Sequence, residues 1–248
     1  LAHPAAVIPF FHAFRERLVL SALVIGSFIP DVWNLAPGRI AREDTHSVHA
    51  LLWPCLPLGL AAYGIFHLLL KRPAAALLPA RIQGLLAPHL AGPSLPSAPL
   101  SKVVASLLLG AATHVVWDSF THSGGRLVEA LPFLQQRWFR IGAMPFPAYR
   151  VIQHASTLLG LVAVGLWVRR WLRAAGPSGE PAAGDEHLRV AAASGTVGVA
   201  IGFALHAAMA PGLTAAPLFG LLPLLRRASI AGLEGLLVAL VAWSVAWQ

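Results

Sequence analysis

Long apolar stretches, separated by shorter proline-rich or charged segments, dominate the pattern of this chain. Five of them approach the roughly 20 residues that a helix needs to cross a bilayer. These are residues 48–70, 100–120, 151–172, 190–210 and 228–247. A sixth stretch, residues 18–29, is too short to cross alone and stops at Pro30. We expect it to form a short N-terminal helix that packs against the spans.

A bilayer admits only helices and closed barrels, and no segment here alternates with the period of two that marks a strand. The pattern therefore predicts an all-α, polytopic membrane helical bundle of about five spanning helices, in a single domain of residues 1–248. Residues 1–170 are expected to form the core of a metal site, described below, and residues 190–248 to add membrane helices. The segment 173–189 predicts an exposed flexible loop, because it is rich in Pro, Gly and charge.

The composition supports the membrane class. Hydrophobic residues make up 57% of the 248 residues and charged residues only 11%, against roughly 25% charged residues in soluble domains. The net charge of +8 comes mainly from arginines in short loops and helix flanks, which argues against nucleic acid and favours anionic lipid headgroups or a phosphorylated substrate. The single cysteine, Cys55, leaves no disulfide framework and no thiolate metal site. The pattern carries no signal for the oligomeric state.

The strongest chemical signal lies within an apolar stretch, in the run THVVWDSFTH at 113–122. His114, Asp118 and His122 are spaced i, i+4, i+8, so at about 100° per residue they fan over roughly 80° of one helix surface. A charged group inside a membrane segment is costly and usually faces a partner or a polar cavity. Imidazole with carboxylate is the ligand set of zinc and of non-haem iron or manganese. The trio therefore predicts a site for one metal ion, or for two ions bridged by Asp118.

Further candidates come to the same side when the chain is followed through alternate membrane faces. His46 precedes the first full span, His122 ends the second and His154 begins the third, so all three reach one surface. Asp31 follows a proline that ends the short N-terminal stretch, and Asp44 lies two residues before His46. We therefore expect a polar metal site near one membrane face.

The opposite face carries basic residues directly beside helix ends. They are Lys71, Arg72, Arg169, Arg170 and Arg173. By the positive-inside rule, this face is expected to be cytoplasmic and the site extracytoplasmic. On the face of the site, Arg126 and Arg150 lie between two candidate spans and are candidates to bind a phosphate or carboxylate of the substrate, with lipid headgroups as the alternative partner.

Several motifs together resemble the bacterial membrane family known as domain of unknown function 4184. They are the N-terminal His-Pro-Ala-Ala, Gly-x-x-x-Pro-Asp at 26–31, Thr-His-Ser at 45–47, His-x-x-Trp-Asp-x-x-Thr-His at 114–122 and Gln-His at 153–154. The Thr-His-Ser triplet also recurs at 121–123. The likeness covers roughly residues 1–170. That family in turn resembles inner-membrane metal-dependent hydrolases and, more remotely, the all-α zinc-dependent phospholipase C and nuclease group. The resemblance implies a protein of the bacterial inner membrane.

The resemblance also implies, position by position, a set of metal ligands. They are His3, Asp31, His46, His114, Asp118, His122 and His154. The cofactor is expected to be a divalent metal, zinc first, in one to three ions, with iron, manganese or magnesium as alternatives.

These observations favour a membrane-embedded, metal-dependent hydrolase of a lipidic phosphoester or diphosphate. A metal-activated water would attack phosphorus, with Asp118 at the metal and Asp31 or Asp44 taking the proton. One alternative keeps the metal and changes the reaction to that of a cyclase, isomerase or lyase on an isoprenoid-type lipid. A second alternative is a non-enzymatic metal or proton transporter, which predicts ionisable residues spread through the bilayer and open to both sides.

Overall fold

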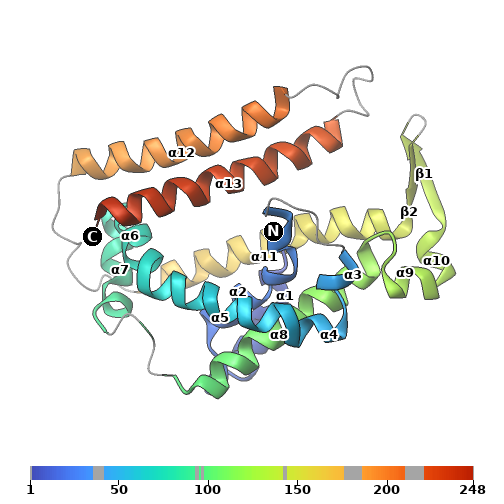
Figure 1. The fold of residues 1–248 in the computed structure, drawn as a ribbon, viewed down its shortest axis with the longest axis horizontal. Helices are drawn as coiled ribbons and strands as arrows, with labels where there is room; N and C mark the ends of the chain where they lie inside the picture. Colours follow the sequence, from blue (N-terminus) through green and yellow to red (C-terminus); the bar gives the residue numbers. More distant parts are fainter. Residues whose placement is uncertain are drawn as a thin grey trace. The chain divides into compact units, whose positions relative to one another are not determined.

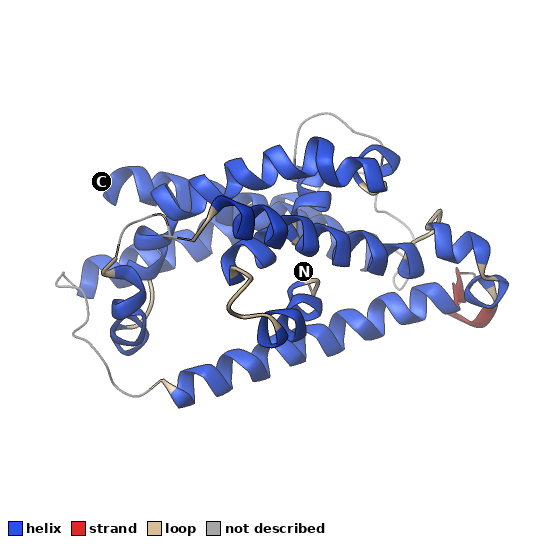
Figure 2. Ribbon diagram, turned by 90° about the horizontal axis from the view of Figure 1, so that it is seen from below, coloured by secondary structure: helices blue, strands red, loops and turns tan. Residues whose placement is uncertain are grey.

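The computed structural model describes residues 2–35, 42–92, 95, 98–141, 144–175, 186–209 and 221–247. Helices make up most of this part of the chain, and a short pair of strands completes it (Figure 2). The expected all-α class is confirmed. The chain divides into two compact units. Unit 1 comprises residues 1–63 and 97–171, and unit 2 comprises residues 64–96 and 172–248.

Five helical segments among the described residues are long and apolar enough to cross a membrane, as the hydrophobic pattern predicted. They are Val48–Ala76, Leu100–Ala130, Ala148–Ala174, Arg189–Met209 and Arg227–Trp247. Only 6% of the most apolar window of Ala148–Ala174 is buried inside the protein, which suits a helix surface that faces lipid. These helices are consistent with a multi-pass membrane protein.

Short helices build the N-terminal part of unit 1 (Figure 1). They are α1 (Pro4–Ala13), α2 (Leu20–Gly26), the 3-10 helix η1 (Ile29–Leu35), α3 (Arg42–Thr45) and α4 (Val48–Ala50). Pro4 occupies the first turn of α1, where its missing N–H has no partner to lose. The helix α2 lies within residues 18–29, where the pattern predicted a short helix.

Three longer helical segments complete the frame of unit 1. They are the π-helical turn η2 (Leu51–Cys55) continuing into α5 (Leu56–Ile65), α8 (Leu100–Thr121) and α11 (Ala148–Ala174). Helix α8 begins directly after Pro99 and ends at a Ser-Gly-Gly turn. Gly124 has a φ of +76°, a conformation that glycine adopts without strain. His122, the first residue after α8, has an extended backbone conformation, with φ −123° and ψ 145°.

Glycines allow α2 and α8 to approach until their backbones touch. A Cβ added to Gly26 would lie 2.3 Å from the Leu107 carbonyl oxygen, and one added to Gly110 would lie 2.2 Å from the Leu23 carbonyl oxygen. No larger residue fits at either position unless a helix moves. The buried core beside this contact consists of Ala22, Tyr63, Val103 and Leu107.

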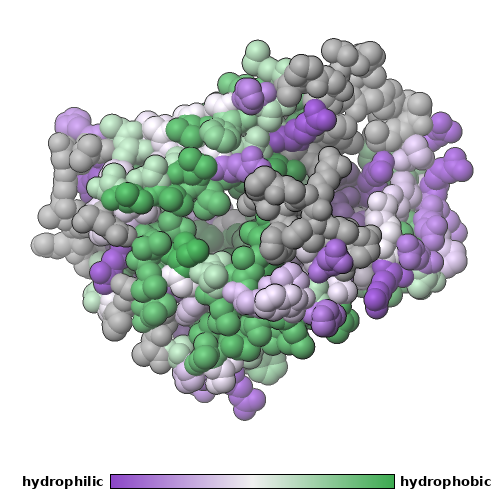
Figure 3. Space-filling model, in the orientation of Figure 1, coloured by the Kyte–Doolittle hydropathy of each residue, from purple (hydrophilic) through white to green (hydrophobic). Residues whose placement is uncertain are grey.

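The segment between α8 and α11 contains a hairpin that the hydrophobic pattern did not reveal. Its elements are α9 (Arg126–Ala130), α10 (Pro132–Gln135), β1 (Arg137–Ile141) and β2 (Met144–Pro147). The strands pair antiparallel, and the rings of Phe139 and Phe146 stack across them with centroids 5.2 Å apart. The residues of β1, RWFRI, do not alternate between apolar and polar, which is why the period of two was missed. Hydrophilic side chains gather over this hairpin (Figure 3).

Unit 2 contains the end of the first spanning segment and two long helices. Its elements are the π-helical turn η3 (Phe66–Leu70), α6 (Lys71–Ala76), α7 (Ala80–Leu90), α12 (Glu186–Met209) and α13 (Leu221–Trp247). Helices α12 and α13 run antiparallel side by side (Figure 1), with Gly235 against Phe203. Helix α7 was not expected in a proline-rich segment, but Pro79 stands just before its first turn, where proline is tolerated. Most of the loop expected at 173–189 lies outside the described residues.

Candidate metal centre

His114 lies at the centre of a polar cluster in the last two turns of α8. The fold buries its side chain and that of Asp118, one turn later. His114 Nδ1 lies 2.8 Å from the carbonyl oxygen of Ser27, at the end of α2. Because a carbonyl only accepts, Nδ1 donates the proton and the lone pair of the ring is on Nε2. This Nε2 is buried and has no hydrogen-bond partner among the described residues.

Three further side chains converge on that nitrogen, so that four side chains from three segments of unit 1 meet there. Asp118 Oδ2 lies 3.4 Å from His114 Nε2 and 3.4 Å from His46 Nε2. Asp31 Oδ1 lies 3.7 Å from His114 Nε2 and 3.6 Å from His46 Nε2. In the described part of the chain, one N or O atom from each of the four lies within 4.8 Å of the other three. We call Asp31, His46, His114 and Asp118 the central cluster.

His46 lies in the link between α3 and α4, where its neighbours in sequence hold the ring. Thr45 is buried, and its Oγ1 lies 2.8 Å from His46 Nδ1. Ser47 caps α4, because its hydroxyl oxygen accepts a hydrogen bond from the Ala50 N–H. The contact at Nδ1 leaves the other ring nitrogen, Nε2, facing the two aspartates.

Asp31 forms the accessible edge of the central cluster. It lies in η1 directly after Pro30, and 39% of its side chain is exposed, compared with 2% for Asp118. Burial alone would raise the pKa of Asp31, but the neighbouring imidazoles of His46 and His114 outweigh it and lower the pKa to about 2. The carboxyl is therefore ionised at neutral pH.

His3 reaches the cluster from the N-terminal end of α1. Its ring stacks on that of His114 with centroids 3.8 Å apart, and its Nε2 lies 3.6 Å from Asp118 Oδ1. Burial lowers the pKa of His3 to about 4, and His114 adds to this shift while Asp118 opposes it. The imidazole is neutral at physiological pH and keeps a lone pair on one nitrogen.

Helix α1 contacts α11 at two points, in addition to its contacts with α2 and α8. A Cβ added to Gly160 of α11 would lie 2.8 Å from the Ala2 Cβ, so the start of the chain approaches closely at a position without a side chain. At the other end of α1, Trp167 Nε1 donates a hydrogen bond of 2.9 Å to His12 Nε2. The two contacts fix both ends of α1 against one helix.

His122, directly after α8, approaches the other carboxylate oxygen of Asp118. Its Nδ1 lies 3.4 Å from Asp118 Oδ1 and 3.1 Å from Thr121 Oγ1. Its Nε2 lies 2.7 Å from the amide nitrogen, Nε2, of Gln153 on α11. The side chain is 31% exposed, so His122 lies at the rim of the site.

The central cluster has the donor chemistry of a divalent-metal site. Zinc bonds of about 2.0–2.2 Å to imidazole and carboxylate place tetrahedral ligand atoms roughly 3.3–3.6 Å apart. The contacts of 3.4–3.7 Å in the central cluster are close to these separations. They are also longer than most protein hydrogen bonds. A cation between these atoms would give His114 Nε2 the partner that it lacks among the described residues.

A family model covers nearly the whole chain. The model, described as a domain of unknown function, DUF4184, matches residues 1–245. The chain belongs to the DUF4184 family. No curated protein and no solved structure matches it. The match extends well beyond the roughly 170 residues over which the motifs had suggested the family.

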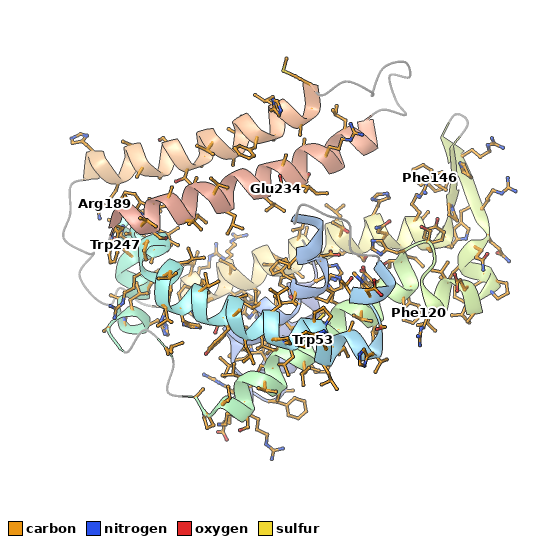
Figure 4. All side chains as sticks on the ribbon, in the orientation of Figure 1. Trp53, Phe120, Phe146, Arg189, Glu234 and Trp247 are labelled. Atoms are coloured by element: carbon orange, nitrogen blue, oxygen red, sulfur yellow. The ribbon has the colours of Figure 1, made fainter. Side chains whose placement is uncertain are left out.

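One histidine expected at the metal of this DUF4184 protein lies outside the central cluster. His154 is exposed near the start of α11, and its ring centroid lies 6.3 Å from that of Phe146, labelled in Figure 4. Within the described ranges it forms no ion pair with Asp31 or Asp118. Its role as a ligand stays a prediction.

The other expected functional residues also lie outside the central cluster. Asp44 is exposed in α3, and Arg126 is exposed at the start of α9. The Arg150 guanidinium lies 5.7 Å from the centre of the Phe146 ring and donates to the Pro145 carbonyl oxygen at 3.4 Å. Proton transfer by Asp44 and substrate binding by the two arginines stay predictions.

Residues that hold the imidazoles were not among the sequence candidates. They are Ser27, Thr45, Thr121 and Gln153. A signal for two of them was present in the repeated Thr-His-Ser triplet, because in both copies the threonine hydroxyl lies beside Nδ1 of the following histidine. Ser27 acts through its backbone carbonyl, which leaves no trace in the sequence.

Proposed function

We propose that the central cluster binds a divalent metal ion, zinc first, and that the protein is a metal-dependent hydrolase of a lipidic phosphoester or diphosphate. The observation that supports the metal site is the buried Nε2 of His114, which has no hydrogen-bond partner among the described residues. Leaving a buried polar atom without a partner costs about 1–3 kcal/mol. A cation held between that nitrogen and the carboxylates at 3.4 and 3.7 Å removes this cost.

The protein holds the proposed ligands in place through contacts outside the cluster. The Ser27 carbonyl orients His114, and the Thr45 hydroxyl orients His46. Such contacts fix the tautomer and direction of a ligating imidazole and raise metal affinity. His3, stacked on His114, is placed to add a further imidazole to the site.

The ligand types favour zinc, because imidazole suits zinc and iron while magnesium prefers oxygen ligands alone. When bound, such an ion polarises a phosphoryl oxygen and lowers the pKa of water. A phosphate oxygen can reach the site beside Asp31, which is 39% exposed, whereas Asp118 is buried. Proton transfer by Asp31 stays a prediction.

A lipid substrate fits the position of the cluster on a helix that is able to span a membrane. Asp118 lies within the candidate span Leu100–Ala130, and the preceding residue, Trp117, is 41% exposed. The exposed residues Val116 and Trp117 therefore offer apolar surface on α8 directly before Asp118 in the sequence. Arg126 and Arg150, in the segment that follows α8, are proposed to bind the phosphate of such a lipid.

We also propose a bacterial inner-membrane location with the cluster on the extracytoplasmic side. Gln153, in the first turns of α11, contacts the site, whereas Arg169 and Arg170 lie near the other end of the same helix. Basic residues beside helix ends favour the cytoplasmic face. A relationship to membrane-bound metal-dependent hydrolases rests on the shared His and Asp motifs.

Metal content of the purified protein tests the site directly. We expect elemental analysis to find zinc in stoichiometric amount in the wild type and little in Asp118→Asn, which keeps the shape of the side chain. His49→Ala is the matched control, because His49 is exposed and lies three residues after His46. Wild-type protein without metal, or equal metal in wild type and Asp118→Asn, would contradict the proposal.

Hydrolysis is tested by phosphate release from vesicles that contain phosphatidic acid or a polyprenyl diphosphate. We expect the zinc-loaded wild type to release inorganic phosphate from at least one of these lipids, and Asp118→Asn to release none. A zinc-loaded protein that leaves both lipids unchanged would contradict hydrolysis of these substrates while the metal site stands. Conversion of the diphosphate lipid without water addition would indicate cyclase or lyase chemistry.

A further inference from the structure

His122 differs from His114 because both of its ring nitrogens have polar partners in the protein. Gln153 Nε2 lies 2.7 Å from His122 Nε2. The amide NH2 group only donates, so His122 Nε2 accepts and carries the lone pair of the ring. The proton of the neutral imidazole is therefore on Nδ1.

The Nδ1 proton faces two oxygens. Nδ1 lies 3.1 Å from Thr121 Oγ1 and 3.4 Å from Asp118 Oδ1. Thr121 donates its own hydroxyl proton to the Trp117 carbonyl oxygen at 3.1 Å, so its oxygen is left to accept. Donors and acceptors consequently run in one direction, from the amide of α11 through His122 to Thr121. The Nδ1–H edge of the ring also faces Asp118 Oδ1 at 3.4 Å, in a contact that does not meet hydrogen-bond geometry.

The two oxygens of Asp118 have different surroundings. Oδ2 lies 3.4 Å from Nε2 of both His46 and His114, whereas Oδ1 lies 3.4 Å from Nδ1 of His122 and 3.6 Å from Nε2 of His3. The carboxylate is only 2% exposed, so protein groups rather than bulk water determine how it is rotated. The electropositive N–H edge of His122 on the Oδ1 side favours the rotation in which Oδ2 is directed into the central cluster.

We infer that His122 is a positioning residue, locked by Gln153, whose Nδ1–H edge faces Asp118 Oδ1 and thereby keeps Oδ2 directed at the metal ion. This inference rests on the proposed function, because Asp118 is taken as a metal ligand. It assigns His122 to the support of the site rather than to the ligand set that the family resemblance implied. Loss of a contact that supports a ligand lowers metal affinity about 10- to 100-fold.

Two substitutions of His122 separate positioning from ligation. The amide nitrogen of Asn occupies nearly the place of imidazole Nδ1, so His122→Asn keeps a donor for Asp118 but replaces the imidazole that a ligand would need. His122→Leu removes the donor. We expect chelator competition on the full chain to show zinc affinity about 10- to 100-fold lower in His122→Leu and largely restored in His122→Asn, with zinc stoichiometry unchanged in both. Loss of stoichiometry in both variants would overturn the inference and make His122 a ligand.

Substitutions on α11 separate the role of Gln153 from simple helix docking. Gln153→Leu removes the donor to His122. Ser156→Ala is the matched control, because Ser156 lies one turn further along and accepts a 3.3 Å hydrogen bond from Trp117 Nε1. Each variant removes one hydrogen bond between a side chain of α11 and the α8 segment. We expect weaker zinc binding only in Gln153→Leu, and equal weakening in both variants would overturn the inference.

The tautomer of His122 provides a readout that needs no metal. Nitrogen NMR of the full chain with isotopically labelled histidine should show His122 protonated at Nδ1 in the wild type and as a mixture of tautomers in Gln153→Leu. Protonation at Nε2 in the wild type would overturn the positioning role even if zinc binds. An Nδ1-protonated ring in a wild type that binds no zinc would instead overturn the proposed function, and with it the role of His122 at a metal.

Discussion

His114 donates its Nδ1 proton to the Ser27 carbonyl oxygen at 2.8 Å, which joins the functional end of α8 to the end of α2. The bond forms because Gly26 and Gly110 allow the two helices to touch along their backbones. Histidines that bind metals are usually oriented by a bond of this kind at the other ring nitrogen. The direction of His114 Nε2 therefore depends on the packing of two helices.

Gly110→Ala tests this dependence on packing. The added Cβ would lie 2.2 Å from the Leu23 carbonyl oxygen, so α2 has to move away and carry Ser27 with it. We expect the free energy of unfolding in detergent to fall by about 1–3 kcal/mol, as in other overpacked cores. Zinc affinity, measured by chelator competition, should fall as well.

Gly165→Ala is the control for that variant. Gly165 lies on α11, and a Cβ added there meets nothing within 4 Å among the described residues. Alanine favours helix over glycine by about 0.8–1.0 kcal/mol, so this variant should be as stable as the wild type or more so. Wild-type zinc affinity in Gly110→Ala would argue against control of His114 by the α2–α8 contact.

Gly160→Val tests whether the docking of α1 delivers His3 to the site. A Cβ at this position would lie 2.8 Å from the Ala2 Cβ, and the larger valine side chain should displace the start of the chain. If His3 contributes a ligand, Gly160→Val and His3→Ala should weaken zinc binding by similar factors. The double variant should bind zinc about as tightly as either single variant, because both changes remove the same contact. Additive losses would show that the two residues act independently.

Metal removal should destabilise the wild type. A ligand present at 100 times its Kd stabilises the folded state by about 2.7 kcal/mol, so chelation is expected to lower the Tm. The Tm of Asp118→Asn, lacking a ligand of the proposed site, should not respond to zinc or to the chelator. A Tm of the wild type that is the same with zinc and with chelator would contradict binding at the central cluster.

Arg126→Gln tests the proposed contact with the substrate phosphate. Hydrogen bonds to charged groups contribute about 1.5–3 kcal/mol, so their loss should raise KM for a phosphorylated lipid roughly 10- to 100-fold. The zinc content should stay at the wild-type level, because Arg126 lies outside the central cluster. Arg189→Gln is the control, since Arg189 is in unit 2 and donates to Gln83 Oε1 at 3.2 Å. A similar change in KM for both variants would indicate a general effect of surface charge.

Much of the fold could be predicted because it depends on local properties of the chain. A candidate span requires only length and apolarity, and the five described helices that are long and apolar enough to cross a membrane were predicted from these two features. The regular rotation of an α-helix likewise places His114 and Asp118 on one surface, whatever the helix packs against. The hairpin of β1 and β2 was missed because strands of four and five residues without alternation have no comparable local signature.

The sequence pattern alone does not determine whether Gln153 or His154 faces the site. Consecutive residues on a helix point about 100° apart, so the rotation of α11 about its axis decides which of the two faces the site. That rotation is set by tertiary contacts, including the approach of Ala2 to Gly160 and the bond from Trp117 to Ser156. As a result Gln153 contacts His122, while His154 lies exposed beside Phe146.

The two Thr-His-Ser triplets share a local contact but differ in the ring nitrogen that faces Asp118. In both, the threonine hydroxyl lies beside Nδ1 of the next histidine, a contact between chain neighbours that the sequence itself determines. His46 nevertheless faces Asp118 with Nε2, whereas His122 faces it with Nδ1. The difference arises because His46 enters from a separate segment while His122 follows Asp118 on the same helix end. The packing of the segment that carries His46 beside α8, and the contact of α11 with His122, decide which ring nitrogen meets the carboxylate.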